Sequence, residues 1–231
     1  MPGRDHLLTT GSIYHVFNKT IDNKQPFLFT DICQKFCDIV VYYRSTQSIL
    51  RFSQFDKQPK SLKQTILTNI LNKKTFRIRI LAYCLMPTHY HFLLRQEHAN
   101  GVSTFISLIQ NSFTRFYNLK HDRKGPLFLH RFKSKPIQTE SLIKHVSRYI
   151  HLNPFSSNLI KDKELLQKYP WSSFHEYFEQ LKPISDVDFV LSYFNNNVKS
   201  YNSFILNNAE HQRMIEECKY TQKWHTPKTT F

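Results

Sequence analysis

Glycine is scarce in this 231-residue sequence, with only four in all, and neither of the glycine-rich motifs that cradle nucleotide phosphates, GxGxxG or GxxxxGK[ST], occurs. No apolar run approaches the ~18 residues that a membrane-spanning helix needs. The first six residues lack the apolar stretch of a signal peptide. These absences argue against a nucleotide-binding loop and predict a protein with no membrane segment.

Cysteine is also sparse. The four cysteines, at positions 33, 37, 84 and 218, show neither a CxxC spacing nor the density of a disulfide framework. We therefore expect reduced thiols in a cytoplasmic protein. Cys33 and Cys37 share a helix face, where they are expected to act as small core residues rather than as metal ligands.

Acidic residues are outnumbered, 17 against 32 Lys and Arg, which gives a net charge of +15 and a pI near 9.7. This balance predicts a polyanionic partner. The sequence is also rich in aromatic residues, with 20 Phe and 12 Tyr. Positive charge combined with aromatic rings suits single-stranded nucleic acid, through backbone contacts and base stacking. An anionic membrane surface is the competing partner, but no basic amphipathic helix stands out.

The stretch 86–95 contains the pair His89 and His91 inside an apolar, aromatic run. On a strand, side chains two residues apart share a face, so the two imidazoles are expected side by side, with Tyr90 and Phe92 on the other face. Neutral imidazole is a common ligand of divalent metals. The motif alone is weak, because twelve histidines in 231 residues produce such pairs by chance, and it favours two half-buried strand histidines over a ligand pair.

Hydrophobic periodicity predicts the element order βαββαβ, followed by further helices. We therefore expect an α+β fold: a ferredoxin-like antiparallel sheet with two helices on one face. Pro136 confines the fourth strand to an edge or end of the sheet. The expected strands are 12–19, 76–84, 86–95 and 132–138, and the expected helices are 30–45, 102–119, 141–152, about 185–194 and about 200–217.

Two segments fall outside this scheme. Residues 46–74 are polar and are expected to form an insertion with a short helix near 62–71. The C-terminal end of the chain is a basic tail.

The helix 141–152 is expected to end before Pro154. Leu142, Val146 and Ile150 form its expected core stripe, which places Tyr149 at the margin of the buried face and Asn153 one turn beyond it. That position suits a tyrosine whose hydroxyl reaches a group held on the sheet. This segment alone favours the alternative, a boundary tyrosine whose ring is buried and whose hydroxyl lies in water.

Taken together, His89-Tyr90-His91, then Arg131-Phe132-Lys133, then 149–154 (YIHLNP) resemble the single-tyrosine HUH transposases (IS200-like), and in particular the REP-associated tyrosine transposases. The resemblance runs from about Ile13 to Phe174 in matching order. It implies a catalytic domain at 1–155 and leaves 156–231 as an aromatic loop and helical extension.

The resemblance implies a transposase that cleaves and rejoins single-stranded DNA by transesterification. Tyr149 would be the nucleophile that forms a 5′-phosphotyrosine link. His89, His91 and Asn153 would bind a divalent metal, Mg²⁺ or Mn²⁺. The expected substrate carries a DNA hairpin, and the expected location is the bacterial cytoplasm, at the nucleoid. Thr88 and Phe155 depart from common family residues, which affects the expected substrate choice more than the chemistry.

Between Arg115 and Arg148 there are nine Lys and Arg against two acidic residues. Such a cluster beside the expected site predicts a track for phosphates, although a solvated surface is the alternative. The residues expected to contact DNA are Lys19, Arg77, Arg79, Arg115, Arg123, Lys124, Arg131, Lys133, Lys135 and Arg148.

Three hypotheses follow from the sequence. The leading one is an enzyme that nicks and rejoins single-stranded DNA. The second is a domesticated protein that binds single-stranded or hairpin DNA without cleaving it. The third is a basic RNA-binding module, which is disfavoured because no RNP-type aromatic motif is present. The sequence leaves open whether the protein is a monomer or a homodimer, and whether Tyr149 acts on the histidines of its own subunit.

Overall fold

The structure is a computed structural model that describes residues 6–179 and 183–216. The basic tail and Cys218 lie outside these residues. The strands are β1 (Ile13–Lys19), β2 (Ile78–Met86), β3 (His89–Gln96) and β4 (Lys133–Ile137). The α-helices are α1 (Thr30–Tyr43), α2 (Phe52–Asp56), α3 (Lys60–Ile70), α4 (Gly101–Lys120), α5 (Glu140–Ser156), α6 (Val187–Leu191) and α7 (Val198–Leu206).

The four strands form one antiparallel sheet in the order β2-β3-β1-β4. β2 and β3 form a hairpin, whereas β1 lies between β3 and β4 and pairs with both. This is the topology of a βαββαβ ferredoxin-like unit, so the predicted α+β fold is confirmed. β4 is an edge strand, as Pro136 predicts, because proline has no backbone N–H to donate and is therefore confined to strands with an unpaired side.

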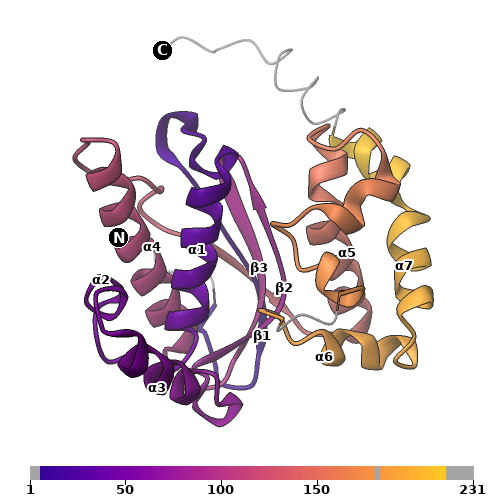
Figure 1. The fold of residues 1–231 in the computed structure, drawn as a ribbon. Helices are drawn as coiled ribbons and strands as arrows, with labels where there is room; N and C mark the ends of the chain where they lie inside the picture. Colours follow the sequence, from indigo (N-terminus) through magenta and orange to yellow (C-terminus); the bar gives the residue numbers. More distant parts are fainter. Residues whose placement is uncertain (1–5, 180–182, 217–231) are drawn as a thin grey trace.

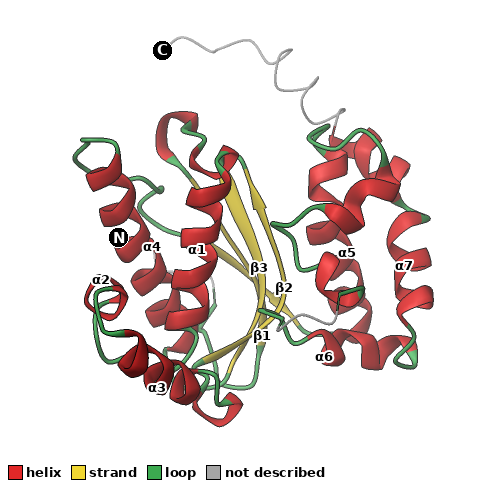
Figure 2. Cartoon of the chain, in the orientation of Figure 1, coloured by secondary structure: helices red, strands yellow, loops and turns green. Residues whose placement is uncertain are grey.

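Helices cover both faces of the sheet (Figures 1 and 2). α1 and α4 pack on one face, while α5 leads into a helical layer on the other. Strand alternation sends Tyr90 and Phe92 into the core beneath α1 and α4. Leu93 belongs to the second core, beneath α5. The histidines of β3 therefore face the α5 layer.

The 46–74 segment contains two helices, α2 and α3, and α3 matches the predicted short helix. Part of this segment joins the core: the rings of Phe52 and Phe55 are buried and lie 5.5 and 4.7 Å from that of Tyr42, between centroids. The segment is polar in composition yet anchored by these two aromatic side chains.

The prediction that the tyrosine helix ends before Pro154 is wrong, because α5 continues to Ser156 with the proline inside it. A proline at this position removes one backbone hydrogen bond. The next turn nevertheless closes, with the Ser157 N–H donating to the Asn153 carbonyl at 3.0 Å. Phe155 is buried in the second core, and that burial holds the last turn in place.

The predicted core stripe of α5 is also displaced. Leu142 is 44% exposed, whereas Ile143, Ser147 and Ile150 are buried. The helix has neighbours on two sides, the sheet and α7, so its buried face is wider than a single stripe and includes His151. Tyr149 still lies at the margin, half-buried.

The last predicted helix, 200–217, is interrupted. α7 ends at Leu206, residues 207 and 208 form a turn, and residues 209–216 are helical again. Both turn residues are asparagines, whose side chains compete for backbone hydrogen bonds and weaken a helix interior.

The outer edge of β2 is covered by the segment 171–173. The Leu85 N–H donates to the Trp171 carbonyl at 2.8 Å, and the Ser173 N–H donates to the Tyr83 carbonyl at 2.9 Å. These bonds satisfy backbone groups that an open edge strand would expose. Within residues 6–179 and 183–216, no helix combines the length and the apolar character needed to cross a bilayer.

Candidate active site

His89 and His91 lie on β3 and share one face of the sheet. Their rings meet edge to face, with centroids 5.0 Å apart and an interplanar angle of 87°. His91 is 5% exposed, whereas His89, at the start of the strand, is half-buried. The arrangement places one imidazole inside the protein and the other at its boundary with solvent.

α5 carries Tyr149 over these histidines. The centroid of the Tyr149 ring lies 5.6 Å from that of His91 at an interplanar angle of 87°, and 5.8 Å from that of His15 at 71°. Both rings therefore meet the tyrosine edge-on, within one chain. The structure brings together the predicted tyrosine and the predicted histidine pair.

Asn153 follows Tyr149 by one turn of α5 and is 8% exposed. Its Nδ2 donates to the Tyr149 carbonyl at 2.7 Å, which fixes the orientation of the carboxamide and leaves Oδ1 as its possible ligand atom. In the described parts of the chain, no three His, Cys, Asp or Glu side chains are grouped so as to hold a metal. An oxygen from a residue such as Asn153 would thus have to complete a ligand set.

His15 is a member of this cluster that the sequence reasoning missed. It lies on β1, 8% exposed, and its Nε2 is 3.0 Å from Nδ1 of His91. The ferredoxin-like strand order contained the signal, because it places the first strand beside the third, and His15 alternates onto the face that bears Phe17.

Burial keeps the cluster uncharged. Desolvation lowers the pKa of His15 to about 4, with a smaller effect from Lys135, and lowers that of His89 to about 4, with a smaller effect from Lys19. Burial also holds the pKa of His91 well below its usual value of 6.5, helped by the neighbouring histidines. All three imidazoles are neutral at pH 7, the form in which imidazole binds metals.

In both His89 and His91, the Nδ1 nitrogen lies within hydrogen-bond distance of a neighbouring side chain. Nδ1 of His89 lies 2.9 Å from Oγ1 of Thr88, and Nδ1 of His91 lies beside His15. In each ring Nδ1 is engaged by a neighbouring side chain, so Nε2 is the nitrogen left to face a ligand. Thr88, one of the departures from the family pattern, contributes directly to the orientation of His89.

Three of the predicted DNA-contacting lysines lie on this same face. Lys19 pairs with His89 across β1 and β3, and Lys135 pairs with His15 across β1 and β4. Lys133 pairs with Phe17 in the same register. All three side chains are exposed, so the half of the face formed by β1 and β4 is a basic surface beside the histidines.

Arg77 and Arg79 lie at the opposite end of the sheet. β2 and β3 pair Ile78 with Gln96 at one end and Met86 with His89 at the other. Arg77 donates to the Ser45 carbonyl at 2.7 Å, and Arg79 forms ion pairs with Glu97 and Asp186. The structure does not bring these two arginines to the histidine cluster.

The remaining predicted contacts are divided between two layers. Arg115 belongs to α4, across the sheet from the histidines, and Arg148 lies on α5 with its guanidinium 4.4 Å from the centroid of Phe204. The loop after α4, which carries Arg123, Lys124 and Arg131, approaches β1 where the Leu129 N–H donates to the Lys19 carbonyl.

A buried polar network holds α5 in place. His151 Nε2 lies 2.7 Å from Ser173 Oγ, and its Nδ1 lies 2.8 Å from Tyr201 Oη. All three residues are fully buried. Because Ser173 is bonded to β2, the network links the tyrosine helix to the sheet and to α7.

Replacing Tyr201 with Phe should lower the free energy of unfolding by about 1–3 kcal/mol, because Nδ1 of His151 loses its partner while buried. Tyr193→Phe, at a half-exposed position in the same layer, should change it by less than about 0.5 kcal/mol. Denaturant unfolding of both variants measures the difference. Equal free energies of unfolding for the two variants would show that the network does not stabilise the position of α5.

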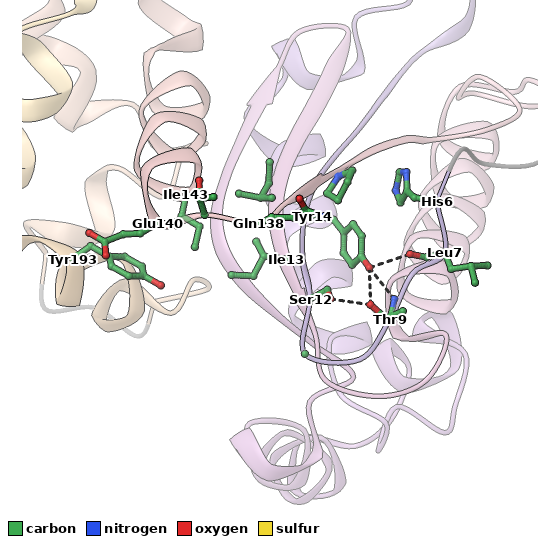
Figure 3. Close-up of a pocket in the computed structure, with 14 residues that line it drawn as sticks. His6, Leu7, Thr9, Ser12, Ile13, Tyr14, Gln138, Glu140, Ile143 and Tyr193 are labelled. Carbon is green, nitrogen blue, oxygen red and sulfur yellow. Dashed lines mark hydrogen bonds between the residues drawn. The ribbon is translucent and has the colours of Figure 1, made fainter.

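A separate cavity of about 550 Å³ lies at the other end of β1, where residues 6–14 meet the start of α5 (Figure 3). Tyr14 closes it, with its hydroxyl donating to the Leu7 carbonyl at 3.2 Å. Glu140 and Tyr193 line the opposite side. None of the lining residues belongs to the histidine–tyrosine cluster.

Comparison with known proteins identifies the family and supports the fold. The family model described as "Transposase IS200 like" matches residues 40–153, a range that contains His89, His91, Tyr149 and Asn153. Among solved structures, a REP-associated tyrosine transposase bound to a REP hairpin is similar in fold, with a TM-score of 0.52 and 18% identity, over 81% of this chain and 93% of that one. No curated protein sequence matches. With the sheet order and the histidine–tyrosine cluster, the match places this chain in the IS200-like transposase family.

Proposed function

We propose that the protein is an enzyme that cleaves and rejoins single-stranded DNA by transesterification, with Tyr149 as the nucleophile. The observation that carries this proposal is the edge-on approach of the Tyr149 ring to His91, with centroids 5.6 Å apart in one chain. Residues 1–155 would form the catalytic unit. Residues 156–231 would form the extension that supports its tyrosine helix.

In the cleavage step, the phenol oxygen of Tyr149 forms a bond to the scissile phosphorus while the bond from phosphorus to the 3′ oxygen breaks. The products are a 5′-phosphotyrosine and a free 3′-hydroxyl, and the proton released by the phenol balances the one gained by the 3′ oxygen. The phosphodiester energy is retained in the covalent link, so the reverse step rejoins DNA without ATP.

The residues present fit a divalent ion, Mg²⁺ or Mn²⁺. Two neutral imidazoles would each bind through Nε2, and Asn153 adds a carboxamide oxygen held by its own Nδ2 bond. When bound, the ion would act as a Lewis acid on the scissile phosphate. His89 and His91 would orient the phosphate through it, and Tyr149, one helical turn from Asn153, would approach from α5.

The basic half of the sheet face supports a path for DNA. Lys19, Lys133 and Lys135 would contact phosphates next to the histidines, and the loop with Arg123, Lys124 and Arg131 would extend the contact along β1. We propose a substrate with a hairpin, by analogy with the similar structure bound to one. The tyrosine and histidines of one chain suffice for this arrangement, which favours a monomer acting in cis.

The test incubates the full chain with end-labelled single strands that carry a hairpin, in Mg²⁺ or Mn²⁺ and in excess chelator. If the protein cleaves DNA in this way, we expect a protein–DNA adduct that survives denaturing electrophoresis and forms only with the metal. A DNA fragment with a free 3′-hydroxyl should appear together with it. Tight binding with no adduct on any strand would contradict cleavage and identify the alternative, a domesticated DNA-binding protein.

Binding should depend on the lysines of the sheet face. Lys133→Gln should weaken single-stranded DNA binding several-fold and reduce the slope of log affinity against log salt by about 0.7, because one phosphate contact is lost. Lys60→Gln, at an exposed position on α3, is the matched control and should leave both unchanged. Fluorescence anisotropy at salt concentrations from about 50 to about 300 mM measures both the affinity and its dependence on salt. Identical slopes for the two variants would remove Lys133 from the DNA path.

A further inference from the structure

His15 has no part in the chemistry described above, although it is in hydrogen-bond contact with His91. Its Nε2 lies 3.0 Å from Nδ1 of His91, and the two rings stack with centroids 5.2 Å apart. The contact joins β1 to β3 across the middle of the sheet and is buried on both sides. A buried polar contact between two rings has a defined direction, because one nitrogen must donate and the other must accept.

The direction of this hydrogen bond decides whether His91 can bind a cation. If Nε2 of His15 donated, Nδ1 of His91 would be the acceptor, and the proton of a neutral His91 ring would sit on Nε2 and block it. If Nδ1 of His91 donates to His15, then Nε2 of His91 carries a lone pair. Only the second arrangement leaves His91 with a nitrogen lone pair that can coordinate a cation.

We propose that His15 is a positioning residue for His91: it accepts a hydrogen bond from Nδ1 of His91 and fixes the tautomer and orientation in which Nε2 binds the divalent cation. This inference rests on the proposed function. A partner that accepts from the second nitrogen is the usual way in which a protein orients a ligating histidine. Here the acceptor is a second imidazole instead of a carboxylate.

The surroundings of His15 suit this role. β1 pairs on both sides, so the backbone at His15 is held by β3 and β4. Its ring is enclosed by Phe17 and Tyr149, with centroids at 5.0 and 5.8 Å. Because its ring also borders Tyr149, His15 connects the orientation of the metal ligand with the packing of the nucleophile.

The experiment compares His15→Phe with His15→Gln in the full chain, using Mn²⁺ alone as the probe. Phe keeps the ring but has no acceptor, and Gln places a carboxamide oxygen near the position of Nε2. We expect His15→Phe to weaken Mn²⁺ binding about 10–100-fold by calorimetry. His15→Gln should restore it to within about threefold of the original protein, a rescue that loss of packing alone would not produce.

A second measurement needs no substitution. The ¹⁵N chemical shifts of the metal-free protein at pH 7 report which nitrogen of each imidazole carries the proton. We expect His91 as the Nδ1–H tautomer, and an Nε2–H tautomer would overturn the inference.

A His91→Ala variant separates this inference from the proposed function. If His91→Ala weakens Mn²⁺ binding and His15→Phe does not, the positioning role of His15 is wrong while the metal site stands. If His91→Ala leaves Mn²⁺ binding unchanged, the proposed metal site is wrong and the positioning role falls with it. If both substitutions weaken binding and Gln rescues, the inference is supported.

Discussion

Tyr149→Phe should abolish the covalent protein–DNA adduct. The rate of adduct formation should fall by about 10³-fold or more, as expected when an enzyme loses its nucleophile. Only the hydroxyl is removed, and the ring that packs edge-on against His91 and His15 stays in place. Single-stranded DNA binding and the free energy of unfolding should therefore change little. The measurement is adduct formation on a denaturing gel beside binding by anisotropy.

Tyr117→Phe is the matched control for this variant. Tyr117 is also half-buried, but it belongs to α4 on the opposite face of the sheet, where its ring lies 4.3 Å from that of His121. The control should form adduct at the original rate. An adduct that persists in Tyr149→Phe and is lost in another tyrosine variant would move the nucleophile to that residue.

The fold was largely readable from local patterns. Alternation identified all four strands to within about three residues, because β1, β2 and β3 each turn one face toward the aromatic core of Tyr90 and Phe92. The proline in β4 correctly marked an edge. The prediction that failed depended on tertiary contacts: the sequence pattern predicts that α5 ends before Pro154, whereas burial of Phe155 stabilises the helix beyond it.

The candidate site was predictable only in part. His89, His91 and Tyr149 were found by motif and helical spacing, and the fold brings their side chains together. The predicted strand order places the strand of His15 beside β3, but His15 belongs to no recognisable motif, so the sequence pattern did not single it out. Arg77 and Arg79 were assigned to the DNA path by charge alone, and charge does not show that their guanidinium groups are engaged elsewhere, at the far end of the sheet.

The buried histidines should make the protein unstable in mild acid. Burial lowers the pKa of His15 and His89 to about 4 and that of His151 to about 3, all from 6.5, and it also holds the pKa of His91 well below 6.5. Between pH 6.5 and 4 the unfolded chain binds protons that the folded chain does not. The free energy of unfolding therefore falls as the pH falls through this window. Above pH 6.5 the contribution of the neutral histidines to stability is fully present.

Each such histidine contributes up to about 1.4 kcal/mol per pH unit to this slope, so four give an upper limit of about 5.5 kcal/mol per unit. A typical domain has only about 5–15 kcal/mol in total. We therefore expect acid unfolding of the metal-free protein to be complete before pH 4. Urea unfolding at a series of pH values in the presence of chelator measures the slope.

Two variants separate titration from general loss of stability. His89→Gln removes one titrating group at a half-buried position and should reduce the slope near pH 5 by about 1.4 kcal/mol per pH unit. Ile109→Val truncates a buried residue of α4 and should cost about 1 kcal/mol at every pH while leaving the slope unchanged. A free energy of unfolding that stays constant from pH 6.5 to 5 would mean that the histidines take up protons in the folded state. The cluster would then be hydrated and open, and the neutral imidazoles required for metal binding would have to be maintained by the cation itself.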